Sequence, residues 1–199
     1  MDDYKRIDAF WDWVVANVQQ IKLIQSTDDE AFEELDLRVK EMDDAIGIEV
    51  GGESPSAGVN RLVITAYGES QLFSKVKRIC SRAPQLRELE VFSLRPPLNE
   101  GLEITQDGLT VRSADIWLHP GLPPSAGHVS LRIGVMVGQQ QNESAAAIKN
   151  LAERVVEAFL GEREFAEKCE LQGVDLLTST PLGQDWCRLE AFREFRTAV

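Results

Sequence analysis

The sequence is poor in the side chains that build metal and redox sites. Its 199 residues include two histidines and three widely separated cysteines, Cys80, Cys169 and Cys187. No two cysteines have the C-x-x-C spacing of a zinc ribbon or of a thioredoxin-type site. An odd number of dispersed thiols is typical of reduced cytosolic proteins. We therefore expect no metal, no cofactor and no disulfide framework.

Long apolar runs are also missing. The longest, such as 62–66 and 133–137, have the length of a strand, far short of the roughly 20 residues that a bilayer span needs. The first residues lead into an amphipathic stretch and not into the uniform apolar core of a signal peptide. The sequence predicts a cytoplasmic protein with no membrane partner.

Basic residues are scattered, and the one compact group is Lys75, Lys77 and Arg78. A nucleic-acid surface needs a basic face with interspersed aromatic side chains. That pattern does not occur, so we expect no nucleic-acid partner.

Negative charge is plentiful and unevenly placed. Residues 1–50 hold 14 acidic side chains against 5 basic ones, and these account for −9 of the overall net charge of −12. Nine of the acids lie between Asp28 and Asp44. Such a segment is typical of a solvated helix face or of a surface that meets a basic partner, and the sequence leaves both open.

Residues 1–50 also have the periodicity of two amphipathic helices. Apolar residues recur at spacings of three and four in two stripes, which are Ile7, Trp11, Val14, Val18 and Ile21, and then Phe32, Leu35, Val39, Met42 and Ile46. This spacing predicts two helices. Ser26 or Thr27 is expected to cap the second helix, with Asp29 or Glu30 as the acid of a capping box. The sequence thus predicts a helical hairpin over 5–46.

Strand patterns follow the hairpin. A short strand at 48–50 is expected to end at Gly51-Gly52, and strand–helix–strand patterns cover 61–94 and 129–177. Between them, Gln106-Asp107-Gly108 separates two short apolar runs and predicts a β-hairpin. Mixed helices and strands with hairpins favour an α+β fold with a mixed or antiparallel sheet and packed helices.

The length suits one domain of residues 1–199. We expect the hairpin at its start, an α+β body over 47–180, and a tail over 181–199 that packs on the body.

Two groups of residues are candidates for function. The first is a ligand site of Arg95, Asp115, Trp117 and His119. Two prolines follow Arg95 and can hold its guanidinium for a carboxylate or phosphate, although pairing with a nearby Asp or Glu at the end of a strand is the simpler explanation and the one that we favour. His119 can act as a general base if its Pro/Gly-rich segment folds over a cleft, or can be an ordinary loop histidine.

The second candidate is an interaction surface on the hairpin, made of Trp13, Glu33, Glu34, Asp36 and Glu41. Phe10, Trp11 and Trp13 crowd two faces of the first helix, so one ring is expected to be exposed, and exposed aromatic groups mark contact surfaces.

Several short runs together resemble a family of uncharacterised bacterial proteins. The runs are Phe10-Trp11 and Trp13 with Asn17, Ile64-Thr65-Ala66 followed by Gly68, Ala83-Pro84, Arg95-Pro96-Pro97, and Asp115-Ile116-Trp117. The family has no assigned activity, so the resemblance implies a bacterial cytosolic origin and no catalytic residue.

The sequence therefore favours a non-enzymatic interaction protein that binds a protein partner or a second copy of itself. An immunity-type protein that masks a basic toxin surface is one concrete form. The alternative is a small hydrolase or an anionic-ligand-binding domain that uses Arg95, Asp115 and His119.

Overall fold

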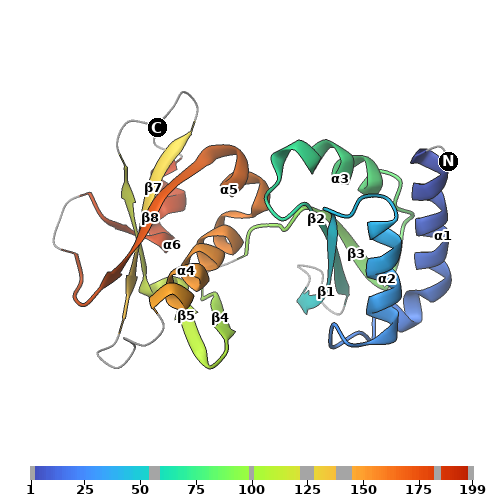
Figure 1. Ribbon diagram of the computed structural model, residues 1–199, viewed down its shortest axis with the longest axis horizontal. Helices are drawn as coiled ribbons and strands as arrows, with labels where there is room; N and C mark the ends of the chain where they lie inside the picture. The colour runs from blue at the N-terminus through green and yellow to red at the C-terminus, as the bar shows by residue number, and fades with distance from the viewer. Residues whose placement is uncertain are drawn as a thin grey trace. The chain divides into compact units, whose positions relative to one another are not determined.

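The computed structural model describes residues 3–53, 59–98, 101–121, 128–137, 145–181 and 185–196. It has the expected α+β fold, with helices packed on small mixed or antiparallel sheets (Figure 1). The sequence predicts a single domain, whereas the structure divides into two compact units, Met1–Pro96 and Pro97–Val199. The strands pair only within these units among the described residues, so each unit has a sheet of its own.

The first unit begins with the predicted helical hairpin and continues into a three-stranded sheet. Its elements are α1 (Asp3–Ile21), α2 (Glu30–Lys40), β1 (Gly47–Glu53), β2 (Asn60–Thr65), the 3-10 helix η1 (Ser70–Leu72), α3 (Phe73–Cys80) and β3 (Leu89–Ser93). β2 lies in the centre, antiparallel to β1 and parallel to β3. Its residues 62–65 are all buried, as is typical of the interior strand of a sheet.

Two expected boundaries in this unit are wrong. β1 does not end at Gly51-Gly52 but continues to Glu53, with an irregularity in its pairing after Val50. Gly51 has a φ of 99°, a left-handed conformation that glycine adopts without strain. The two glycines therefore distort the strand instead of ending it.

The second helix is also shorter than its apolar stripe. α2 ends at Lys40, so Met42 and Ile46 lie outside the helix, and Ile46 is nevertheless fully buried. The chain turns at this point because the Asp43 carboxylate accepts the backbone N–H of Ala45 at 3.0 Å, which competes with helical bonding.

The start of α2 also differs from the predicted capping box. Asp29 is the residue that precedes the helix, and its carboxylate accepts the backbone N–H groups of Gln25 and Ser26 at 2.7 and 3.0 Å. The acid thus reaches back to the interhelical turn, and the serine side chain gives the helix no cap.

The second unit combines a β-hairpin, a four-stranded sheet and three helices. Its elements are β4 (Glu103–Gln106), β5 (Leu109–Arg112), the 3-10 helix η2 (Ser113–Asp115), β6 (Ile116–Pro120), β7 (Val129–Met136), α4 (Ala145–Leu160), α5 (Glu162–Lys168), β8 (Cys169–Leu177), β9 (Cys187–Arg188) and α6 (Leu189–Arg196). The hairpin of β4 and β5 turns at Asp107 and Gly108, which both have positive φ. This is the turn predicted for an Asp-Gly pair.

The four-stranded sheet has the order β8-β7-β6-β9. β6 is not predicted from the sequence, and it is the partner that makes β7 an interior strand. Ile116 and Leu118 of β6 are buried, whereas the alternate residues Trp117 and His119 are only half-buried. The strand has five residues and runs directly into a Pro/Gly-rich segment, so its alternation of apolar and polar side chains is too short to predict a strand.

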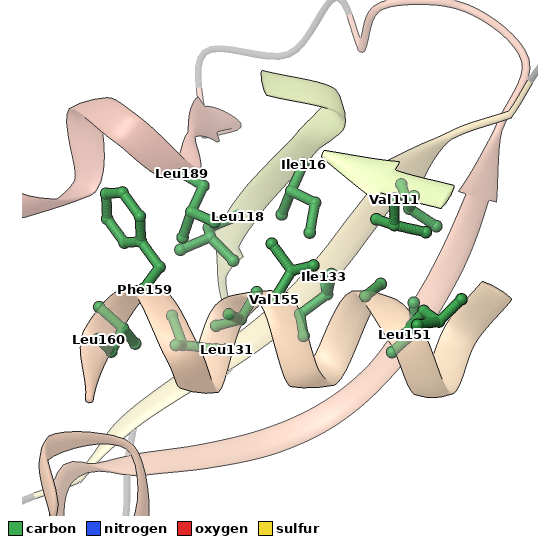
Figure 2. Packing of buried hydrophobic residues seen from close by; sticks show 14 of the residues in the cluster. Val111, Ile116, Leu118, Leu131, Ile133, Leu151, Val155, Phe159, Leu160 and Leu189 are labelled. Carbon is green, nitrogen blue, oxygen red and sulfur yellow. The ribbon is translucent and has the colours of Figure 1, made fainter. Parts of the chain in front are cut away.

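The core of the second unit lies between α4 and this sheet (Figure 2). Phe159 and Val155 of α4 are fully buried together with Leu118 and Ile133 of the sheet. Leu189 and Phe192 of α6 also belong to this cluster. The first residues of α6 therefore contribute to the second core.

The two predicted strand–helix–strand patterns adopt the same topology. β2 and β3 are parallel and joined through α3, and β7 and β8 are parallel and joined through α4 and α5. In each unit the first of these strands also pairs with the preceding strand in antiparallel fashion. The likeness of the two patterns thus extends from sequence periodicity to strand pairing.

Loss of one aromatic ring from the second core tests its contribution to stability. Phe159 is fully buried, and Phe159→Ala is expected to lower the free energy of unfolding by about 3–5 kcal/mol because it leaves a cavity. Val129→Thr, at a position that is 38% exposed in β7, is the control and should change it by less than about 0.5 kcal/mol. Urea unfolding measures both, and equal small effects would contradict this packing.

Candidate functional site: a groove between the first two helices

The orientation of α1 is fixed by a buried tryptophan. The indole N–H of Trp11 donates a hydrogen bond of 2.9 Å to the carbonyl of Ile79, in the last turn of α3. Trp11 itself is 3% exposed, and Ile7 and Val14 are buried on the same side of the helix. α1 therefore cannot rotate without breaking a buried hydrogen bond, which is costly.

The turn and the end of the hairpin are tied to the rest of the unit. The side-chain amide of Asn60 in β2 donates to the carbonyl of Lys22, in the interhelical turn. Beyond α2, the Lys75 ammonium of α3 contacts the Asp43 carboxylate and the Met42 carbonyl, both at 2.8 Å. The hydrogen bond from Lys75, with a smaller effect of the Ala45 N–H, holds the pKa of Asp43 below its ordinary value. These contacts hold the two helices in place.

A groove of about 760 Å³ lies between the two fixed helices. Its walls come from one face of α1, one face of α2 and the turn that joins them. The lining residues are Trp13, Asn17, Gln20, Leu23, Ile24, Asp29, Glu30, Ala31, Glu33, Glu34 and Leu37. Spacings of three and four along each helix place these side chains on a common face.

Apolar groups in the groove are unusually exposed. Leu23 is 70% exposed and Leu37 is 57% exposed. Trp13 is half-buried, and the guanidinium of Arg38 lies 4.8 Å from its ring centre. Exposed apolar side chains gathered at one groove are typical of contact surfaces.

The residues that line the groove carry only negative charge, and Arg38 lies at its margin, against Trp13 and Glu34. Its lining includes four carboxylates and no lysine or arginine. Two of the four have local partners, because Asp29 accepts two backbone N–H groups and Glu34 pairs with Arg38 at 2.6 Å. Among the residues that the structure describes, no ion pair involves Glu30 or Glu33. These two carboxylates are available to an incoming cation.

The predicted interaction surface coincides with the groove in part. Trp13, Glu33 and Glu34 line it. Asp36 does not, and pairs with Lys40 at 2.5 Å. Glu41 also lies outside the lining, and its carbonyl accepts a hydrogen bond from Arg6.

Leu23 and Leu37 are not among the site residues predicted from the sequence. Leu37 lies two residues after Leu35, outside the apolar stripe of its helix. Leu23 follows the last residue of the first stripe by two. The sequence signal for such a contact residue is an apolar side chain that lies off the regular apolar stripe of its helix.

Arg95 of the predicted ligand site belongs to the first unit. Its Nε donates to the Glu49 carboxylate at 2.7 Å, and its guanidinium lies 5.3 Å from the ring centre of Tyr67. The prediction that a nearby acid pairs with Arg95 is confirmed.

Asp115, Trp117 and His119 belong to the second unit. Asp115 ends η2, and the other two lie on β6. Arg188 stacks 5.4 Å from the Trp117 ring centre. The His119 ring lies 5.1 Å from that of Trp186, so His119 is part of a strand and not of the predicted loop.

The described residues include no group of three or more His, Cys, Asp or Glu side chains placed to hold a metal ion. The burial of Cys80 raises the pKa of its thiol to about 12, which makes it a poor nucleophile. No helix in the described part of the chain has the length and apolarity to cross a membrane.

In comparisons with known proteins, no family model, curated protein or solved structure matches this chain. The resemblance to uncharacterised bacterial proteins therefore stays a prediction.

The ion pair at the end of the hairpin predicts a pH dependence. Because the pKa of Asp43 is lowered in the folded protein, its charge stabilises the fold at pH values above the ordinary value of 3.8, and this stabilisation is lost as the pH falls through the lowered pKa. Asp43→Asn keeps an oxygen for the Ala45 N–H but removes the charge. The variant should be less stable than the natural protein at pH 7, and the difference should vanish in strong acid. Urea unfolding across pH measures this, and a pH-independent difference would contradict it.

Proposed function

We propose that this protein is a non-enzymatic interaction module that binds a basic partner protein through the groove between α1 and α2. The observation that carries the proposal is the combination, in one groove, of exposed Leu23 and Leu37 with four carboxylates and no lysine or arginine among the lining residues. Apolar contact supplies affinity, and the carboxylates select a positively charged surface. An immunity-type protein that masks a basic toxin surface is one concrete form of this function.

The charge around the groove also affects association rates. Residues 1–50 carry a net charge of −9, which attracts a basic protein at a distance and speeds its encounter. Salt screens such attraction, so binding should weaken as ionic strength rises. Two copies of this chain would repel each other at the same surface, and this favours a different protein over self-association.

The described residues do not provide comparable support for the alternative, a hydrolase or an anion-binding site that uses Arg95, Asp115 and His119. Arg95 already contacts the Glu49 carboxylate, and the pairing lowers its attraction for another anion. His119 lies 4.0 Å from the Asp185 carboxylate and beside the Trp186 ring. We therefore propose only the interaction function.

Neutralising the two unpaired groove carboxylates tests the proposal. The full chain, immobilised, is incubated at low salt with an extract of the organism that encodes it. We expect a basic protein to be retained, to elute with rising salt, and to be captured about tenfold less by the variant Glu30→Gln with Glu33→Gln.

The matched control is Asp12→Asn with Glu69→Gln. It makes the same change in net charge in the same unit, at two exposed residues outside the groove lining. Control and natural protein should capture the partner equally. Equal capture by all three proteins would show that the groove charge has no part in binding, and the proposal would then be wrong.

A further inference from the structure

The groove between α1 and α2 has dimensions that suit the binding of a third helix. Its lining extends from Trp13 to Gln20 along α1 and from Glu30 to Leu37 along α2. Each stretch rises about 10 Å, or two helical turns, at 1.5 Å per residue. Two packed helices present an open furrow along their line of contact, and the side-chain ridge of another helix fits such a furrow.

We infer that the occupant is an amphipathic α-helix of the partner, with apolar side chains on one face and lysine or arginine beside them. This inference rests on the proposed function and specifies the partner's binding element. The apolar side chains contact Leu23, Leu37 and Trp13, and the basic side chains reach Glu30 and Glu33.

Backbone hydrogen bonding distinguishes a helix from an extended segment in this groove. Both walls are helices, whose backbone groups bond within the helix, and so they offer no strand edge for pairing. An extended segment placed there would lose water from its N–H and C=O groups without gaining partners. A helix satisfies its own backbone and presents only side chains to the groove.

The spacing of the two unpaired carboxylates defines the pattern of charge on the occupant. Glu30 and Glu33 are three residues apart, close to one turn of α2. Basic residues one turn apart on the incoming helix would face both carboxylates. A second copy of the hairpin, with nine acids between Asp28 and Asp44, lacks this pattern.

Binding of synthetic helices tests the inference. The probe is a stapled peptide of about 14 residues, or four turns, with leucines at i, i+3/i+4 and i+7 on one face and lysines beside them. The first comparison peptide has the same composition with the leucines scattered around the helix. The second has a proline at its centre and cannot form the helix. Isothermal titration calorimetry measures the affinity of each peptide for the full-length protein.

Two protein variants locate the binding site. Leu37→Gln removes an apolar group that is 57% exposed, and glutamine keeps a similar helix propensity. Val15→Gln is the matched control, because Val15 is 48% exposed on α1 but does not line the groove. Thermal melts should show that both variants remain folded.

We expect the striped probe to bind, and the scattered and proline peptides to bind at least about tenfold more weakly. Leu37→Gln should lower the affinity for the peptide with leucines on one face by about tenfold. Val15→Gln should leave that affinity unchanged. No binding of the striped probe at about 1 mM, equal binding of all three peptides, or no effect of Leu37→Gln would overturn the inference.

The result of the peptide-binding experiment can be distinguished from the result of the capture experiment that tests the proposed function. If the extract still yields a basic partner whose capture depends on Glu30 and Glu33, but the helical probe does not bind, then the partner uses another element and the interaction function stands. If neither occurs, both proposals fail.

Discussion

The hydrogen bond from Trp11 to the Ile79 carbonyl is the constraint on which the groove depends. It joins the middle of α1 to the last turn of α3, with the donor ring buried. Once Trp11 faces the interior, the rotation of α1 is set, and Trp13, two residues later, lies on a different face. A helix that is fixed before a partner arrives loses less conformational entropy on binding, which favours affinity.

The acids of the hairpin divide into those that have local partners and those that have no ion pair in the described structure. Asp29 holds the interhelical turn, Asp43 pairs with Lys75, and Glu34 pairs with Arg38. Glu30 and Glu33 have no such ion pair in the described structure. Net charge alone therefore overstates the recognition surface, and the function that we propose depends on the position of these two carboxylates.

Much of the fold could be predicted from sequence, because apolar periodicity reports directly on burial. The two long helices, the central strand β2 and the Asp-Gly hairpin follow from local patterns. β6 could not be predicted, since its five residues run into a Pro/Gly-rich segment. Nor could the exposure of Leu37, because a side chain off the apolar stripe can be covered by any neighbouring element. The acidic composition placed most of the charge on the first two helices but did not show which carboxylates already had partners.

Site-specific photo-crosslinking in the living cell tests the central claim most directly. A photoreactive phenylalanine analogue replaces Leu37 in the groove or, as a control, Val15 outside it. The account predicts a crosslink from position 37 to a basic protein, through a peptide that belongs to an amphipathic helix, and none from position 15. No crosslink from position 37, or the same crosslinked proteins from both positions, would contradict the claim that this groove binds the partner.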